Sequence, residues 1–275
     1  MEVRLGPYVL DVATGFGPRI IGLRHEHGPP LFALLSPELG IAHETGFYRF
    51  RGGHRLWAGP ENPSVTYAGD ERDCLVSEDE QSVRISAPPD NAGLVKEIEV
   101  TADGSGLTVE HRLTAAAGTE LTVAPWAITQ LPLGGTALLT MQGAETAPLP
   151  DRSVVLWPYT NADDPRLRLG RTVMTVAAEA GPNLKVGIGP TPSRIGYFRE
   201  GWLFVKAFVD DGGGEVPDFG AVHQVFVGAH FCELETVGGA VTVRSDGGAR
   251  LTERWEAAAV RDVESAMDRL MAGGR

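Results

Sequence analysis

Apolar and polar residues alternate along most of this chain, in short segments separated by glycine and proline. The clearest case is residues 94–101 and 107–114, joined by AspGlySerGly at 103–106. Strict alternation on both sides of such a turn predicts a β-hairpin. Val109, His111 and Leu113 share its apolar face, so we expect His111 to be a core histidine rather than a ligand.

The same pattern predicts a long series of strands and one helix. We expect strands at residues 8–13, 19–24, 75–78, 82–86, 121–128, 137–141, 153–156, 171–177, 185–188, 201–208, 222–227, 231–237, 240–244 and 250–257. Regularly spaced strands with turn residues between them are typical of a sandwich of antiparallel sheets, an all-β fold. Residues 260–272 instead place Val263, Met267 and Leu270 on one helical face, followed by Gly273 as a stop. We therefore expect one domain over residues 1–258, with a C-terminal helix in 259–275 that packs on it or on a partner chain.

Net charge, apolar stretches and cysteine content exclude several classes of binding partner. The 275 residues carry a net charge of −12 with a pI near 5.0, the wrong sign for a phosphate-binding groove, so no nucleic-acid partner is expected. The N-terminus lacks a basic segment followed by an apolar run, and no apolar stretch approaches the roughly 20 residues that span a bilayer. We therefore expect no membrane partner. Cys74 and Cys232 show no disulfide-framework or zinc-binding spacing; a single bridge between them is one interpretation, and two reduced thiols in a cytoplasmic protein are the simpler one, which we expect.

The sequence GFYRFRGGHRLWAGPE, Gly46 to Glu61, concentrates arginine, histidine and aromatic residues around a glycine pair. Arginine makes planar contacts with oxygen-rich ligands, aromatic rings offer stacking faces, and glycine lets the backbone bend or approach another chain closely. The stretch is too polar and too aromatic for an ordinary core strand. It is either a polar ligand cleft with sugar-like chemistry or a surface loop whose arginines pair with acids and whose Trp57 caps the core.

Several other segments allow both a binding and a structural interpretation. Trp126 follows Pro125 and either stacks on a sugar or fills core. Lys206 shares a strand face with Trp202 and Phe204 and either ends an aromatic cleft or points outward. The loop of residues 157–166 has calcium-type oxygens at positions 161, 163 and 164 but no twelve-residue calcium loop, so a solvated turn is favoured and no metal is expected.

A late strand carries the clearest acid/base candidates. On a strand over this segment, Glu233 and Glu235 point to one face together with Phe231, while His230, Cys232 and Leu234 point to the other. Two carboxylates so close repel each other, and one of them could have a raised pKa and act as a base. An exposed strand face carrying two glutamates is the alternative.

Taken together and in order, these motifs resemble the galactose-mutarotase-like superfamily of aldose 1-epimerase folds. The similarity is greatest to a branch marked by a GGHRLW–PE segment. The motifs are Gly52 to Glu61, Ala124 to Thr129, Trp157 to Arg166, Phe204 to Gly220 and Glu233 to Gly238, and they extend over roughly Val3 to Trp255. The resemblance implies a β-supersandwich with a concave face that binds a small-molecule carbohydrate, in a monomer or homodimer without a cofactor.

The resemblance also implies roles for individual residues. In such epimerases a late-strand glutamate takes the proton of the anomeric hydroxyl and a histidine protonates the ring oxygen. Glu235 matches the base best and Glu233 is the next candidate, while His54 lies in the early glycine–histidine segment. The implied substrate contacts are Arg51, Arg55, Trp57, Glu61, Trp126, Tyr159, Lys206 and Asp218.

One departure from the family pattern leaves the activity open. The family's mid-chain catalytic histidine is missing, because the matching stretch reads AlaProTrpAlaIle with Trp126 near that position. His54, or less favourably His223, would have to supply the acid. We therefore expect either an aldose 1-epimerase-like isomerase or a carbohydrate-binding protein without catalysis, with a different sugar reaction as a third option. If the site is assembled as expected, His54, Arg51, Trp126, Lys206 and Glu235 line one cleft.

Overall fold

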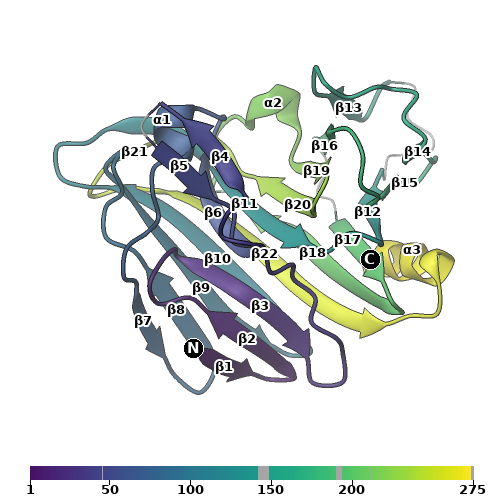
Figure 1. The fold of residues 1–275 in the computed structure, drawn as a ribbon, viewed down its shortest axis with the longest axis horizontal. Helices are drawn as coiled ribbons and strands as arrows, with labels where there is room; N and C mark the ends of the chain where they lie inside the picture. Colours follow the sequence, from purple (N-terminus) through teal and green to yellow (C-terminus); the bar gives the residue numbers. More distant parts are fainter. Residues whose placement is uncertain (45, 142–148, 190–193, 211, 274–275) are drawn as a thin grey trace.

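Two large antiparallel sheets form the molecule. The computed structural model describes residues 1–44, 46–141, 149–189, 194–210 and 212–273, and within them twenty strands make two sheets of ten (Figure 1). The predicted sandwich of antiparallel sheets with a helix near the C-terminus is confirmed.

Sheet I contains the strands nearest the N-terminus and a group from the second half of the chain. In spatial order they are β1 (Glu2–Leu5), β2 (Tyr8–Val12), β3 (Arg19–His25), β6 (Gly53–Gly59), β11 (Leu121–Leu131), β20 (Cys232–Val237), β19 (His223–Val227), β16 (Leu184–Gly189) and β13 (Ser153–Leu156), with β21 (Val241–Val243) paired to β11. The centre of sheet I therefore joins segments that are more than a hundred residues apart.

Sheet II contains the predicted hairpin and the longest strands. In order they are β14 (Leu167–Leu169), β15 (Val173–Ala177), β12 (Thr136–Thr140), β17 (Arg194–Arg199), β18 (Trp202–Asp210), β22 (Ala249–Ala259), β10 (Gly106–Ala115), β9 (Leu94–Asp103), β8 (Ser82–Ser86) and β7 (Leu75–Glu78). A separate small hairpin pairs β4 (Gly40–His43) with β5 (Gly46–Arg49).

Three apolar clusters show how the layers pack. The largest fills the space between the sheets, where alternate residues of each strand point inward. A second, which includes Tyr48, Trp57 and Trp126, covers the outer face of sheet I. In a third, Ala266 and Leu270 of α3 (Val263–Ala272) pack on the outer face of sheet II. Asp262 caps α3 by accepting a hydrogen bond from the Ser265 amide at 2.8 Å.

Short helical turns complete the described structure. They are α1 (Pro63–Thr66), which lies beside β6, and α2 (Pro217–Gly220). None of the helices in the described ranges combines the length and the apolar character needed to cross a membrane.

The stretch from Gly46 to Glu61 differs from the interpretation of it as a surface loop. It contains β5 and β6, and every residue of β6 is buried although the segment includes His54, Arg55 and Trp57. The expectation that it is too polar for a core strand is wrong, because each face of β6 packs against a different layer. Residues 54 and 56 point between the sheets, whereas residues 55 and 57 point to the outer face of sheet I.

The glycine pair permits a close approach of two backbones at the start of β6. Gly53 has φ of 72°, and a Cβ placed on it would lie 2.3 Å from the Ile20 carbonyl oxygen of β3. The expectation that these glycines allow a bend or a close approach is confirmed.

Gly53→Ala should therefore lower the free energy of unfolding by at least about 2 kcal/mol, since left-handed backbone strain and overpacking add together. Gly69→Ala is the matched control, because a Cβ there meets nothing within 4 Å. Urea denaturation measures both. Equal stability of the two variants would contradict the close approach.

Candidate functional site

A cleft of about 400 Å³ opens on the outer face of sheet I. Its lining within the described residues is Ile41, Phe50, Arg55, Trp57, Glu61, Tyr67, Trp126, Tyr159, Asn183, Lys185, Phe226, Gly228, Ala229, His230, Phe231, Glu233 and Glu235. The lining includes seven phenylalanine, tryptophan or tyrosine side chains and a few converging charged groups, which is typical of small-molecule sites.

Strand register explains why these residues meet. Trp57 of β6 lies opposite Trp126 of β11, and Arg55 lies opposite Ile128. Ile128 in turn lies opposite Glu235 of β20, and Gln130 lies opposite Glu233. Because alternate residues of neighbouring strands share a face, these side chains all lie on the outer face of sheet I, where Arg55, Trp57, Trp126, Glu233 and Glu235 line the cleft.

Glu235 lies at the floor of the cleft and is fully buried. Its Oε2 accepts hydrogen bonds from the Trp126 indole at 2.7 Å and the Lys185 ammonium at 2.8 Å. Its Oε1 has no hydrogen-bond partner in the described part of the chain. A buried acceptor without a donor is costly, so a ligand hydroxyl that donated to Oε1 would gain a strong interaction.

The surroundings of Glu235 also change its acidity. Burial raises the pKa of the Glu235 carboxyl, Lys185 and Trp126 lower it, and the nearby Glu233 carboxylate raises it further. The net result is a pKa above the ordinary glutamate value, which shifts the group toward the range where a general base works at neutral pH.

Lys185 is held in an aromatic cage. Its Nζ lies 4.6 Å from the ring centroids of both Trp126 and Trp157, and it forms an ion pair with Glu235. Cation–π contacts of this kind stabilise an ammonium that has lost most of its water. Trp126 thus contributes to the cleft wall and to the core of the outer layer.

Glu233 forms a second buried ion pair beside the first. Its Oε1 accepts from Arg55 Nη2 at 2.8 Å and from Gln130 Nε2 at 3.0 Å. The Arg55 guanidinium stacks on the Trp57 ring at 4.1 Å.

At the rim of the cleft, the Tyr67 hydroxyl donates to Glu61 Oε1. Burial, followed by that bond and the Glu61 charge, raises the pKa of Tyr67.

Seven of the sequence-predicted site residues line this cleft: Arg55, Trp57, Glu61, Trp126, Tyr159, Glu233 and Glu235. The pairing of Glu233 and Glu235 on one face with Phe231 is confirmed by the lining, while Cys232 and Leu234 belong to the inter-sheet core. Both cysteines are free.

The structure does not bring His54 and Lys206 to the cleft, so the expectation of one shared cleft is wrong for them. His54 precedes Arg55 on β6 and therefore points to the opposite face of sheet I from Glu235, into the space between the sheets. Burial and the neighbouring His111 hold its pKa well below the ordinary histidine value. Lys206 of β18 also points inward, where its Nζ lies 3.0 Å from Glu253 Oε1.

Arg51 and Asp218 also lie outside the cleft lining. Arg51 Nη2 donates to the exposed Glu71 at 2.7 Å, and Asp218 accepts from Gln224 Nε2 at 3.0 Å. His223, the second candidate for the acid, is buried and contacts Thr236 on the inward face of sheet I. His111 is buried as expected for a core histidine. In the 157–166 loop, Asp164 is paired with Arg166 at 2.7 Å rather than presented to a ligand.

Sequence reasoning missed Lys185, Tyr67 and His230. Lys185 had one usable signal, because it is a lone charge at the start of an apolar strand. Tyr67 follows the short α1 turn and belongs to no periodic pattern. His230 lines the cleft, so the expectation that it faces away from Glu233 and Glu235 is wrong, because it lies in the connection before β20, where the alternation does not extend.

Comparison with known proteins identifies the fold. No protein-family model and no curated protein matches the chain. A galactose mutarotase-like protein from Lactobacillus casei has a similar structure, with 9% sequence identity, a TM-score of 0.59 and coverage of 94% of this chain and 99% of the other. A galactose mutarotase-like protein from Clostridium acetobutylicum gives 8% identity, a TM-score of 0.57 and coverage of 94% and 95%.

A galactose mutarotase related enzyme from Lactobacillus acidophilus gives 8% identity, a TM-score of 0.53 and coverage of 95% and 98%. These likenesses cover nearly the whole of each chain. The chain therefore has the galactose mutarotase-like fold, as the motif order implied.

Proposed function

We propose that the cleft on sheet I binds a carbohydrate and that Glu235 is the base of an aldose 1-epimerase-like isomerisation. The observation that carries this proposal is the buried Glu235 carboxylate at the floor of an aromatic cleft, with Oε1 lacking a donor. The anomeric hydroxyl of a sugar would supply that donor.

The shape and chemistry of the cleft suit a sugar ring. Its volume of about 400 Å³ lies within the usual range for small-molecule sites. Trp57 and Trp126 meet edge to face with ring centroids 5.4 Å apart, and both rings line the cleft, where they would contact the C–H face of a pyranose. Arg55, Lys185 and Asn183 supply polar groups for its hydroxyls.

The proposed reaction needs a base and an acid. Glu235 would take the proton of the anomeric hydroxyl as the ring opens and return it as the ring closes on either face. The raised pKa of Glu235 favours this exchange at neutral pH. For the acid at the ring oxygen we infer His230, the histidine among the described cleft-lining residues, in place of the core residue His54.

Carbohydrate binding without catalysis is the second candidate. Two observations favour it: His54 lies in the core, and Lys185 already occupies Oε2 of Glu235. In this alternative the same cleft holds the sugar but no acid and base act together across the ring.

The wild-type protein should bind an aldose, uronic acid or sugar phosphate with a change in tryptophan fluorescence, because Trp57 and Trp126 line the cleft. Calorimetry with a panel of these sugars measures binding, and polarimetry on freshly dissolved α-anomers measures catalysis. Binding without acceleration would favour the second candidate. Absence of binding across the panel would contradict both.

A further inference from the structure

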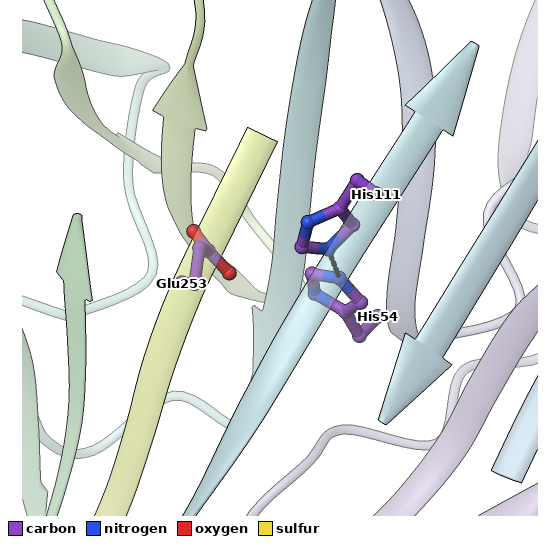
Figure 2. Close-up of side chains that lie close together, drawn as sticks. All are labelled: His54, His111 and Glu253. Atoms are coloured by element: carbon purple, nitrogen blue, oxygen red, sulfur yellow. Dashed lines mark hydrogen bonds between the residues drawn. The ribbon is translucent and has the colours of Figure 1, made fainter. Parts of the chain in front are cut away.

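We propose that His54, His111 and Glu253 form a structural zinc site that ties the two sheets together. These residues are the histidine cluster, shown in Figure 2, and they lie in the inter-sheet core away from the proposed sugar cleft. Their ligand atoms, two ring nitrogens and a carboxylate oxygen, all lie within 4.8 Å of one another.

The cluster joins strands of both sheets. His54 comes from β6 of sheet I, whereas His111 and Glu253 come from β10 and β22 of sheet II. All three residues are at most 1% exposed. An ion held between them would therefore bridge the sandwich at its centre, as structural metal sites bridge separate elements.

The hydrogen bonds around the imidazoles define which nitrogens carry protons. His111 Nδ1 lies 2.9 Å from the Leu251 carbonyl oxygen, which can only accept, so Nδ1 carries the proton. Neutral His111 then has a lone pair on Nε2, and His54 Nε2, 2.7 Å away, must donate to it. His54 Nδ1 accepts from the Thr129 hydroxyl at 2.8 Å.

Zinc would need a lone pair on both Nε2 atoms. A change of tautomer in His54 provides this without losing a proton: the hydrogen moves from Nε2 to Nδ1, where the Thr129 hydroxyl accepts instead of donating. His111 needs no change. In both histidines the Nδ1–H group would then donate to an oxygen, of Thr129 for His54 and of Leu251 for His111. Such a hydrogen bond orients metal-binding histidines in proteins.

Distances allow the ion with a small adjustment. With Zn–N bonds of about 2.0–2.1 Å, two nitrogens of a tetrahedral site are about 3.3 Å apart. The two Nε2 atoms lie 2.7 Å apart, so the rings must separate by about 0.6 Å. Imidazole and carboxylate are ligands that zinc accepts together.

Lys206 is the cation that competes with the metal. Its Nζ lies 3.0 Å from Glu253 Oε1, while Glu253 Oε2 accepts from the Trp255 indole at 2.8 Å. Each carboxylate oxygen has a further lone pair, so Glu253 can hold the ion and both donors. The Lys206 ammonium also donates to the carbonyls of Ala127 and Leu234 at 3.2 and 3.3 Å, which hold it in place.

The test is to unfold the wild-type protein in chelator and refold it with or without zinc. We expect one tightly held zinc per chain by elemental analysis. Binding at a hundredfold excess over the dissociation constant should raise the melting temperature by about 5–10 °C. Refolding with cobalt instead should give a visible absorption band that is present only when the metal is bound.

Variants locate the metal. His111→Gln and Glu253→Gln should lose the zinc and the cobalt spectrum, and His27→Gln, which changes a histidine that is 78% exposed, should keep both. Zinc retained equally by all variants would place the ion elsewhere and overturn the proposal. If the buried variants do not fold, the wild type still decides: no retained metal and no change in melting temperature would overturn the zinc site.

Discussion

Glu235→Gln should abolish most of any anomer interconversion while leaving sugar binding largely intact. The amide has the shape of the carboxylate and can still accept from Trp126, but it cannot take a proton from the anomeric hydroxyl. Losing one acid/base partner typically lowers the rate by about 10²–10⁴-fold. Polarimetry measures the rate and calorimetry measures the affinity. A large fall in rate with little change in affinity would identify an interaction made in the transition state.

Glu233→Gln is the matched control. Glu233 is on the same strand and cleft face, two residues away, and forms an equivalent ion pair with Arg55. Since Arg55 and Gln130 already occupy Glu233 Oε1, we expect a smaller loss of rate from this change than from Glu235→Gln. The reverse order would assign the base to Glu233. Equal, wild-type rates for both variants would contradict a base on β20.

The architecture could be predicted because alternation is a local property of the chain. The hairpin of β9 and β10 and most strands of both sheets follow from period-two patterns and turn residues. β6 was missed because both of its faces are covered, one by the inter-sheet core and one by the cleft. Residues such as His54 and Arg55 look polar in sequence, yet each finds a buried partner from a distant strand, His111 for His54 and Glu233 for Arg55.

The candidate site could be predicted only in part for the same reason. Alternation correctly placed Glu233 and Glu235 together, and Trp202, Phe204 and Lys206 share a face as expected. It could not tell which face of each strand looks into the cleft. Lys206 and His54 were therefore expected in the cleft but lie in the core, and the lysine beside Glu235 is Lys185. That assignment depends on how distant strands stack, which no local pattern contains.

Another buried ion pair organises the chain around β6. Arg19 of β3 is fully buried, and its Nη2 lies 2.8 Å from Asp70 Oδ2. Its Nη1 donates to the carbonyls of Phe50 and Gly52 at 2.6 and 3.0 Å, and its Nη2 also donates to the Tyr48 hydroxyl at 2.8 Å. One guanidinium thus holds the segment that leads from β5 into β6, and Asp70 neutralises its charge.

Asp70→Asn should lower the free energy of unfolding by about 3–5 kcal/mol, because it leaves the Arg19 charge buried without a partner. Glu71→Gln is the matched control: Glu71 is the next residue and contacts both Arg49 and Arg51, but its side chain is 49% exposed. Screened, exposed pairs contribute about 0–1 kcal/mol. Urea denaturation of both variants compares the two, and similar losses would contradict the buried pair.

The pH dependence of Asp70→Asn gives an independent check of the same pair. Burial alone would raise the pKa of Asp70, but the Arg19 charge and the hydrogen bonds from Arg19 and Tyr48 outweigh it, so the pKa lies below the ordinary value. The folded state then binds the proton more weakly than the unfolded state. The stabilisation is therefore complete above the unfolded pKa of about 3.9 and is lost as the pH falls through the folded pKa. The stability difference between wild type and Asp70→Asn should be constant near neutral pH and shrink below about pH 4. A difference that stayed constant into strong acid would mean that the Asp70 charge contributes nothing to holding Arg19.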